Sequence, residues 1–134
     1  AQLIARAHKL SAELLATQND MCVLHGDLHH DNIRLSARGY CAFDARGVVG
    51  ERAFELANAF RNPKGAREIV ISPVRIRWLA DMWSERFSVD RTRLLQWAAA
   101  KCALSIAWRS KGVFESDDEV ELLELLLGAA QEQT

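Results

Sequence analysis

The sequence lacks the marks of a membrane protein and of a protein that coats nucleic acid. No apolar run approaches the roughly 20 residues needed to span a bilayer, and the first ten residues have neither the apolar region nor the cleavage site of a signal peptide. Seventeen basic residues against eighteen acidic ones leave no basic excess for a phosphate backbone. We therefore expect a soluble, cytoplasmic protein with no membrane or nucleic-acid partner.

Cysteine is scarce as well. Cys22, Cys41 and Cys102 are odd in number and form no CxxC pair, so neither a disulfide framework nor a structural zinc site is expected. We interpret them as small buried hydrophobic residues in a reducing compartment. The sequence also does not begin with Met, so we expect it to start inside a longer chain.

The 134 residues, nearly half of them apolar, suffice for one domain with a core but not for two domains. Apolar residues at helical spacing predict a first helix over about residues 2–17. The short apolar run 21–24 then predicts a buried strand. Residues 33–36 and 40–43 flank a turn that contains Gly39, which predicts a β-hairpin.

Helices dominate the rest of the sequence. Residues 51–61 predict a helix ended by Asn62-Pro63, and Ser72-Pro73 is a typical start for the next one. Its core face is expected to consist of Val74, Trp78, Met82, Leu79 and Trp83. Asp90 can cap a long helix that ends at Gly112 and is apolar enough to be central, while Ser116 and Glu119 form a capping box for a last helix over 120–127. The expected fold class is α+β and mainly helical, a helical bundle with one small hairpin.

Polar residues that suit metal and phosphate chemistry surround this hairpin. Asp27 and Asn32 lie five apart in the segment HGDLHHDN, and Asp44 follows the second strand. Because paired strands lie about 5 Å apart, the hairpin should bring Asp44 back to Asn32. An amide oxygen and a carboxylate suit Mg²⁺, and a further carboxylate can orient a hydroxyl for phosphoryl transfer.

These segments resemble the aminoglycoside phosphotransferase family, a branch of the protein-kinase-like superfamily. HGDLHHDN is similar to its catalytic loop, with the kinase spacing between Asp27 and Asn32. FDARGVVGE (43–51) is similar to its version of the metal-binding DFG segment. The continuation, ERAFELANAFRNP (51–63), is similar to the streptomycin kinase and hydroxyurea-resistance kinase group. The resemblance implies the C-terminal lobe of a kinase-like fold and transfer of the γ-phosphate of ATP to a small-molecule hydroxyl.

The resemblance also implies roles for individual residues. Asp27 would be the catalytic base or hydroxyl-orienting group, and Asn32 and Asp44 would hold Mg²⁺. His25 would brace the loop, and Glu55 falls where family members often carry an aspartate that steadies it. Arg46 stands where relatives often have lysine, which would place a positive charge near the phosphates.

Several other residues have two interpretations. His29 and His30 could be metal ligands, and His30-Asp31 spells the HD pair of metal-dependent phosphohydrolases, but that chemistry belongs to all-helical folds. The preferred interpretation places both histidines beside the acceptor pocket. The tryptophans are expected mostly in the core, Trp108 being the candidate for a site. The remaining candidates for binding a cationic acceptor are Asp81, Glu85, Asp117 and Asp118, whose ordinary role is that of charged helix residues.

A working kinase also needs a Gly-rich loop and a strand lysine over the nucleotide, and neither motif occurs in this sequence. We therefore expect the N-terminal lobe to be missing from the chain and the fragment alone to be inactive. Three functions stay open. The first is an aminoglycoside kinase, the second a related kinase for homoserine, choline, a fructosamine or a macrolide, and the third a non-catalytic remnant that acts as a binding module.

Overall fold

The computed structural model describes residues 2–110 and 119–132. The expected helix stop at Gly112 and the capping residue Ser116 lie outside these ranges. The elements in chain order are α1 (Gln2–Ala16), β1 (Met21–Leu24), the 3₁₀ helix η1 (His30–Asn32), β2 (Ile33–Ser36), β3 (Gly39–Ala42), β4 (Val48–Glu51), the 3₁₀ helix η2 (Arg52–Arg61), α2 (Arg67–Val70), α3 (Pro73–Arg86), α4 (Arg91–Ser110) and α5 (Val120–Gln131). The chain is therefore mainly helical, with short antiparallel strand pairs.

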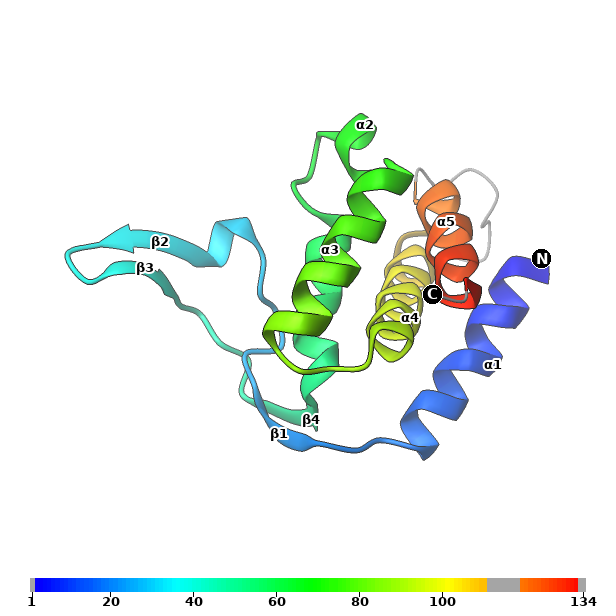
Figure 1. Ribbon diagram of the computed structural model, residues 1–134, viewed down its shortest axis with the longest axis horizontal. Helices are drawn as coiled ribbons and strands as arrows, with labels where there is room; N and C mark the ends of the chain where they lie inside the picture. The colour runs from blue at the N-terminus through cyan, green and yellow to red at the C-terminus, as the bar shows by residue number, and fades with distance from the viewer. Residues whose placement is uncertain (1, 111–118, 133–134) are drawn as a thin grey trace.

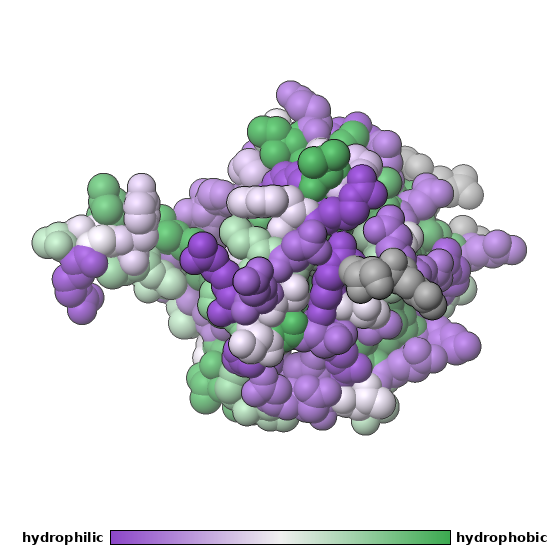
Figure 2. Space-filling view, viewed as in Figure 1, coloured by the Kyte–Doolittle hydropathy of each residue, from purple (hydrophilic) through white to green (hydrophobic). Residues whose placement is uncertain are grey.

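The molecule consists of a helical body and a projecting arm (Figure 1). The arm is the predicted hairpin, in which β2 pairs antiparallel with β3. A second pair, β1 with β4, lies where the arm joins the body. The space-filling view shows the arm extending past the body, with hydrophobic and polar residues mixed along it (Figure 2). The arm therefore carries little of the hydrophobic core.

Helix α4 is the centre of the body, as its apolar sequence predicted. Leu94, Leu95, Cys102 and Ile106 are completely buried in it, among residues of η2, α1, α3 and α5. A helix that is apolar on most sides is stable only when neighbours cover it on most sides. No helix in the described part of the chain is long and apolar enough to cross a membrane.

Two of the helix starts that the sequence predicted are confirmed, whereas α5 has Glu119 itself as its N-cap rather than as the third residue of a capping box. The Ser72 side chain accepts a hydrogen bond from the backbone N–H of Arg75 at the start of α3, and the Asp90 carboxylate accepts one from that of Arg93 at the start of α4. These caps satisfy N–H groups that have no partner within the helix. At the end of η2, the Arg75 guanidinium donates to the backbone carbonyls of Ala59 and Asn62.

Three features of the strands and helices differ from the prediction. Strand β1 is mostly exposed rather than buried, since of its residues only Leu24 is buried. Strand β4 was not predicted, because its partner β1 lies far away in the sequence and four residues carry little local signal. The helix predicted over 51–61 is present, but with the tighter 3₁₀ geometry.

The core face of α3 also differs from the prediction. Val74 and Trp78 are 71% and 59% exposed, whereas Ile76, Leu79 and Ala80 are buried. Of the tryptophans, Trp97 is buried and Trp83 packs partly against the core, but Trp78 and Trp108 lie largely in solvent. The expectation of a core position is wrong for Trp78, because α3 turns the neighbouring stripe of Ile76, Leu79 and Ala80 inward. Trp108, on α4, is the tryptophan that the sequence had singled out as a site candidate.

The cysteines follow the prediction in part. All three are free thiols. Cys102 is completely buried in α4, where burial raises the pKa of its thiol well above the ordinary value. Cys22 and Cys41, on β1 and β3, are only partly buried, so they are not the core residues that the sequence suggested.

Candidate active site

The loop between β1 and η1 is held from beneath by one carboxylate. Glu55, on η2, accepts hydrogen bonds from the backbone N–H groups of His25 at 2.5 Å and Gly26 at 3.0 Å. Gly26 has φ +85°, a conformation that favours glycine. Glu55 therefore fixes the direction in which the chain leaves β1, and its side chain is long enough to reach both amides.

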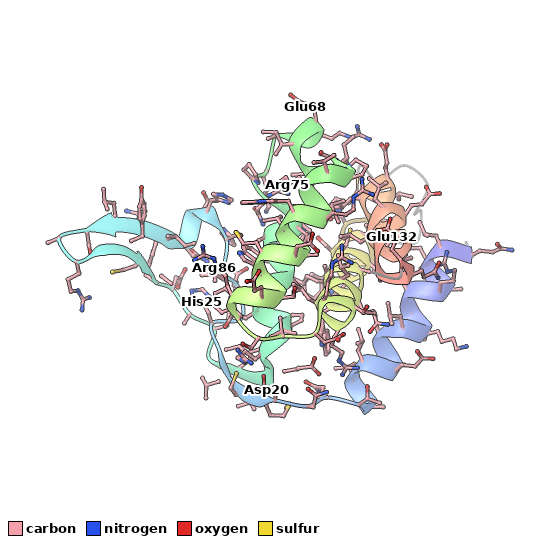
Figure 3. The ribbon with its side chains drawn as sticks, in the orientation of Figure 1. Asp20, His25, Glu68, Arg75, Arg86 and Glu132 are labelled. Carbon is pink, nitrogen blue, oxygen red and sulfur yellow. The ribbon has the colours of Figure 1, made fainter. Side chains whose placement is uncertain are left out.

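The ring of His25 joins this loop to the segment that follows the hairpin. Its Nδ1 accepts a hydrogen bond from the backbone N–H of Asp27 at 3.2 Å, and its Nε2 lies 2.6 Å from the carbonyl oxygen of Phe43. An acceptor at Nδ1 and a carbonyl at Nε2 require the neutral tautomer with the proton on Nε2. The backbone of Arg46 adds a second link, since its N–H donates to the His25 carbonyl. Figure 3 shows His25 at the base of the arm.

Asp27 and Asn32 lie side by side across the loop. The Asn32 amide nitrogen donates to the Asp27 carbonyl at 2.8 Å and approaches the Asp27 carboxylate at 3.5 Å. Asn32 is buried, so its orientation is constrained. Because its nitrogen is occupied, the amide oxygen of Asn32 is the atom that can bind a cation.

The hairpin register brings Asp44 next to this pair. Ile33 pairs with Ala42, and the backbone N–H of Phe43 donates to the Asn32 carbonyl at 2.9 Å. Asp44 therefore follows the residue that pairs with Asn32, and it is exposed. Its φ of +58° is one of the few left-handed values at a residue other than glycine, and aspartate tolerates it better than most residues. The donor types fit Mg²⁺, which takes a few protein oxygens and leaves other positions to water and phosphate.

Two further side chains face the Asp27 carboxylate. Arg46 Nη2 lies 3.6 Å from Asp27 Oδ2, and His29 Nε2 lies 3.7 Å from the same oxygen. The other ring nitrogen of His29 accepts a hydrogen bond from the backbone N–H of Asp31. His30, in contrast, is exposed. Among the described residues, no three His, Cys, Asp or Glu side chains are arranged to hold a metal ion.

Comparison with known proteins assigns the chain to a family. Residues 1–112 match the family described as aminoglycoside/hydroxyurea antibiotic resistance kinase. The chain belongs to this family. It is 38% identical to streptomycin 3''-kinase of Klebsiella pneumoniae over 109 residues, which are 78% of this chain and 41% of that relative. The chain thus spans about two fifths of the length of the curated relative it matches. No solved structure matches it.

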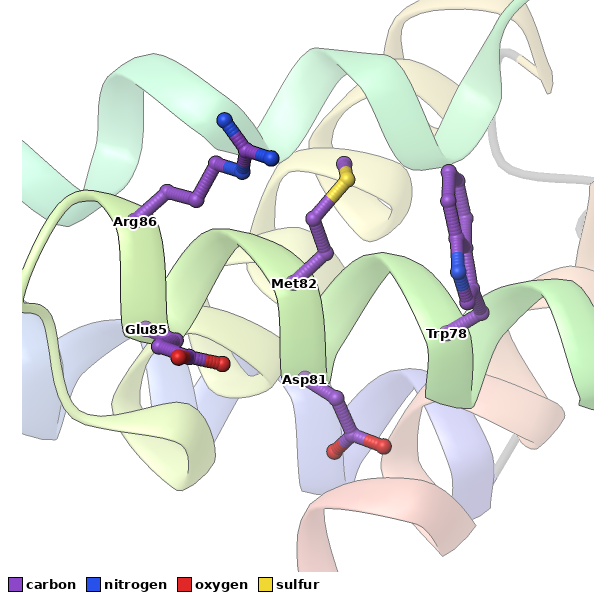
Figure 4. Close-up of a pocket in the computed structure, with 5 residues that line it drawn as sticks. All are labelled: Trp78, Asp81, Met82, Glu85 and Arg86. Carbon is purple, nitrogen blue, oxygen red and sulfur yellow. The ribbon is translucent and has the colours of Figure 1, made fainter.

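The candidate acceptor residues of this kinase-family chain do not all lie together. Asp81 and Glu85 line a surface pocket of about 650 Å³ on α3 (Figure 4). Trp78, Met82 and Arg86 point one way along this helix, and the two carboxylates point another. Asp81 is also paired with Arg91 at 2.6 Å. Trp108 lies on α4, and Asp117 and Asp118 lie outside the described residues.

One residue of this region was missed by the sequence interpretation. Lys101, on α4, lines a small cavity beneath the loop together with Gly26, Leu28 and Glu55. Its ammonium lies 5.7 Å from the ring centre of Phe54 on η2. The available signal was its position, because it carries the single charge in the otherwise uncharged stretch 94–108.

Proposed function

We propose that this chain carries the catalytic and acceptor side of an ATP- and Mg²⁺-dependent kinase that phosphorylates a hydroxyl of a cationic aminoglycoside such as streptomycin. In this proposal it corresponds to the C-terminal lobe of a protein-kinase-like fold, and an N-terminal lobe in a longer protein supplies the other wall of the nucleotide site. The observation that carries the proposal is the convergence of Asp27, Asn32 and the Asp44 backbone at the base of the arm. Membership of an antibiotic resistance kinase family supports it.

The residues divide the work by their chemistry. Asp27 accepts a hydrogen bond from the acceptor hydroxyl, orients it and takes its proton as the hydroxyl oxygen bonds to the γ-phosphorus and the bond to the bridging oxygen of ADP breaks. Asn32 and Asp44 would hold Mg²⁺, which neutralises phosphate charge when bound. His25 and Glu55 keep the loop in place through its backbone, and the positive charge of Arg46 near Asp27 favours phosphate oxygens at this point.

The proposal is tested by phosphate transfer from ATP to streptomycin, with the full-length product that contains this chain. Asp27→Ala should reduce the rate by about 10²–10⁴-fold, the usual contribution of a positioned acid–base group. Asp31→Ala is the matched control, because its carboxylate lies in the same loop and its side chain is 89% exposed. It should retain nearly full transfer, and both variants should melt within a few degrees of wild type.

Other results would change the proposal in defined ways. Transfer that survives Asp27→Ala would remove the role of Asp27. Transfer to homoserine, choline, a fructosamine or a macrolide, but not to streptomycin, would keep the kinase and replace the acceptor. Tight binding of Mg·ATP by the 134-residue chain alone would contradict our expectation that the fragment is inactive without a second lobe.

A further inference from the structure

Lys101 lies in an unusual place for a lysine. It comes from the middle of the central helix α4, and its ammonium lies close to two aromatic rings, 5.7 Å from the centre of Phe54 and 5.8 Å from that of Trp108. It lines the cavity beneath Gly26 and Leu28, directly below the loop that carries Asp27. Lysines usually extend the ammonium into water, whereas this one is half buried at a candidate active site.

No described residue accepts a hydrogen bond or forms an ion pair with the Lys101 ammonium. Burial lowers its pKa, the charges of Arg61 and Arg46 also lower it, and the charge of Asp27 opposes them. Removing a charged group from water is costly unless a partner replaces the lost hydrogen bonds. The aromatic rings compensate for part of this cost, but they provide no oxygen acceptor.

The charges nearby indicate what kind of partner is missing. Arg46 approaches the Asp27 carboxylate from the segment after the hairpin, and Lys101 contributes a second positive charge from α4. Two cations therefore reach the region of Asp27 from separate elements, while the Glu55 carboxylate that lines the same cavity is occupied by the backbone N–H groups of His25 and Gly26. A doubly charged oxyanion satisfies this arrangement better than a neutral or cationic group does.

We infer that Lys101 binds an oxygen of the phosphoryl group at the site, beside Asp27 and beneath the loop. The inference rests on the proposed function for the identity of the anion, because phosphoryl transfer concentrates negative charge on the oxygens of the group in transit. Lys101 is then an electrostatic contact from the helical body. It complements Arg46, and the Trp108 ring lies next to its ammonium.

Trp108 makes the inference measurable without turnover. The 134-residue chain is labelled with 5-fluorotryptophan, and the Trp108 fluorine signal is assigned with Trp108→Phe. Inorganic phosphate should shift this signal in the wild-type chain, whereas sodium chloride at the same ionic strength should not. Lys101→Met should lose the shift, Lys101→Arg should keep most of it, and the control Lys9→Met, at an exposed lysine of α1, should match wild type.

The outcomes separate this inference from the proposed function. A wild-type Trp108 signal that does not respond to phosphate, or an unchanged response in Lys101→Met, would overturn the role of Lys101. In the full-length kinase, Lys101→Met should lower kcat by about 10²-fold with little change in the KM for streptomycin, and Lys101→Arg should restore much of it. If phosphate binds through Lys101 but no acceptor is phosphorylated, the proposed function fails and the anion site stands.

Discussion

Two pairs of a carboxylate and an arginine show how the body and the arm differ. In the body, Glu51 is 2% exposed and its Oε1 lies 2.7 Å from Arg93 Nη2. At the base of the arm, Asp27 and Arg46 are 3.6 Å apart, and the Arg46 side chain is 70% exposed. The first pair is a short bond to a buried carboxylate, whereas the second is longer and exposed and can exchange its partner for a ligand. Similar residue types therefore serve structure in one region and are available for chemistry in the other.

The Glu51 pair connects several elements of the body. Asn19 and Trp97 also donate hydrogen bonds to the Glu51 carboxylate. Arg93 in turn donates to the backbone carbonyls of Leu14 and Thr17 at the end of α1. Burial alone raises the pKa of Glu51, but the bonds from Arg93, Trp97 and Asn19 together outweigh it and hold the pKa below its usual value. The group thus fastens α1, β4 and α4 to one another.

The largest expected effect comes from breaking this group. Glu51→Ala removes the carboxylate partner of the Arg93 guanidinium and the acceptor of the Trp97 N–H, and it should lower the free energy of unfolding by about 3–5 kcal/mol. Urea denaturation measures this loss. Glu68→Ala on exposed α2 is the matched control and should change stability by less than about 0.5 kcal/mol. Equal losses in the two variants would show that burial of the Glu51 pair has no energetic consequence.

The pH dependence of stability provides a second test of the role of Glu51. Because the pKa of Glu51 is lower in the folded chain than its ordinary value of 4.5, its contribution is complete above that value and disappears as the pH falls through the folded pKa. The stability difference between wild type and Glu51→Gln should therefore be constant near neutral pH and shrink in acid. A difference that stays constant in acid would contradict the assignment of this pKa shift to the folded state.

The sequence predicted the interactions between residues close together in the chain, but not those between distant residues. The helix starts at Ser72 and Asp90 were predictable because their caps involve residues three positions away. The meeting of Asn32 with the Asp44 segment was predictable because a short hairpin connects them. Strand β4 was missed because its pairing with β1 spans many residues, and neighbouring apolar positions on α3 did not reveal that Ile76 faces inward rather than Trp78.

Lys101 shows the limit of sequence interpretation at the site. Its place beneath the loop depends on how α4 packs against η2, which no local pattern of residues encodes. The contacts of Glu55 depend on the same packing, but the family resemblance had already pointed to its position. Residues within one loop and hairpin could therefore be grouped from sequence, whereas a residue contributed by the helical body could not.

A smaller effect is expected where the arm joins the body. A Cβ at Gly26 would lie 3.0 Å from Val48 Cγ2 and 3.2 Å from Arg46 Cβ, and the residue has a positive φ. Gly26→Ala should cost about 2–3 kcal/mol, from backbone strain together with these contacts. Gly47 also has a positive φ, but a Cβ added there would have no atom within 4 Å. Gly47→Ala should therefore lower the free energy of unfolding by only about 1 kcal/mol. The difference in stability between the two variants, measured by thermal denaturation, gives the contribution of the steric contacts at Gly26. Equal losses of stability would show that the loop moves freely over β4.

The smallest effect is expected in the arm itself. Leu35 is 69% exposed and pairs across the hairpin with Tyr40, which is 78% exposed, so little apolar surface is lost when it changes. Leu35→Thr keeps a strand-forming residue and should alter the free energy of unfolding by less than about 0.5 kcal/mol. The equally simple change Leu122→Ala, in the buried face of α5, should cost about 2–5 kcal/mol. Since a two-stranded hairpin is only marginally stable alone, a large loss from Leu35→Thr would mean that the arm unfolds together with the body. The contrast between the buried body and the exposed arm would then not extend to their stability.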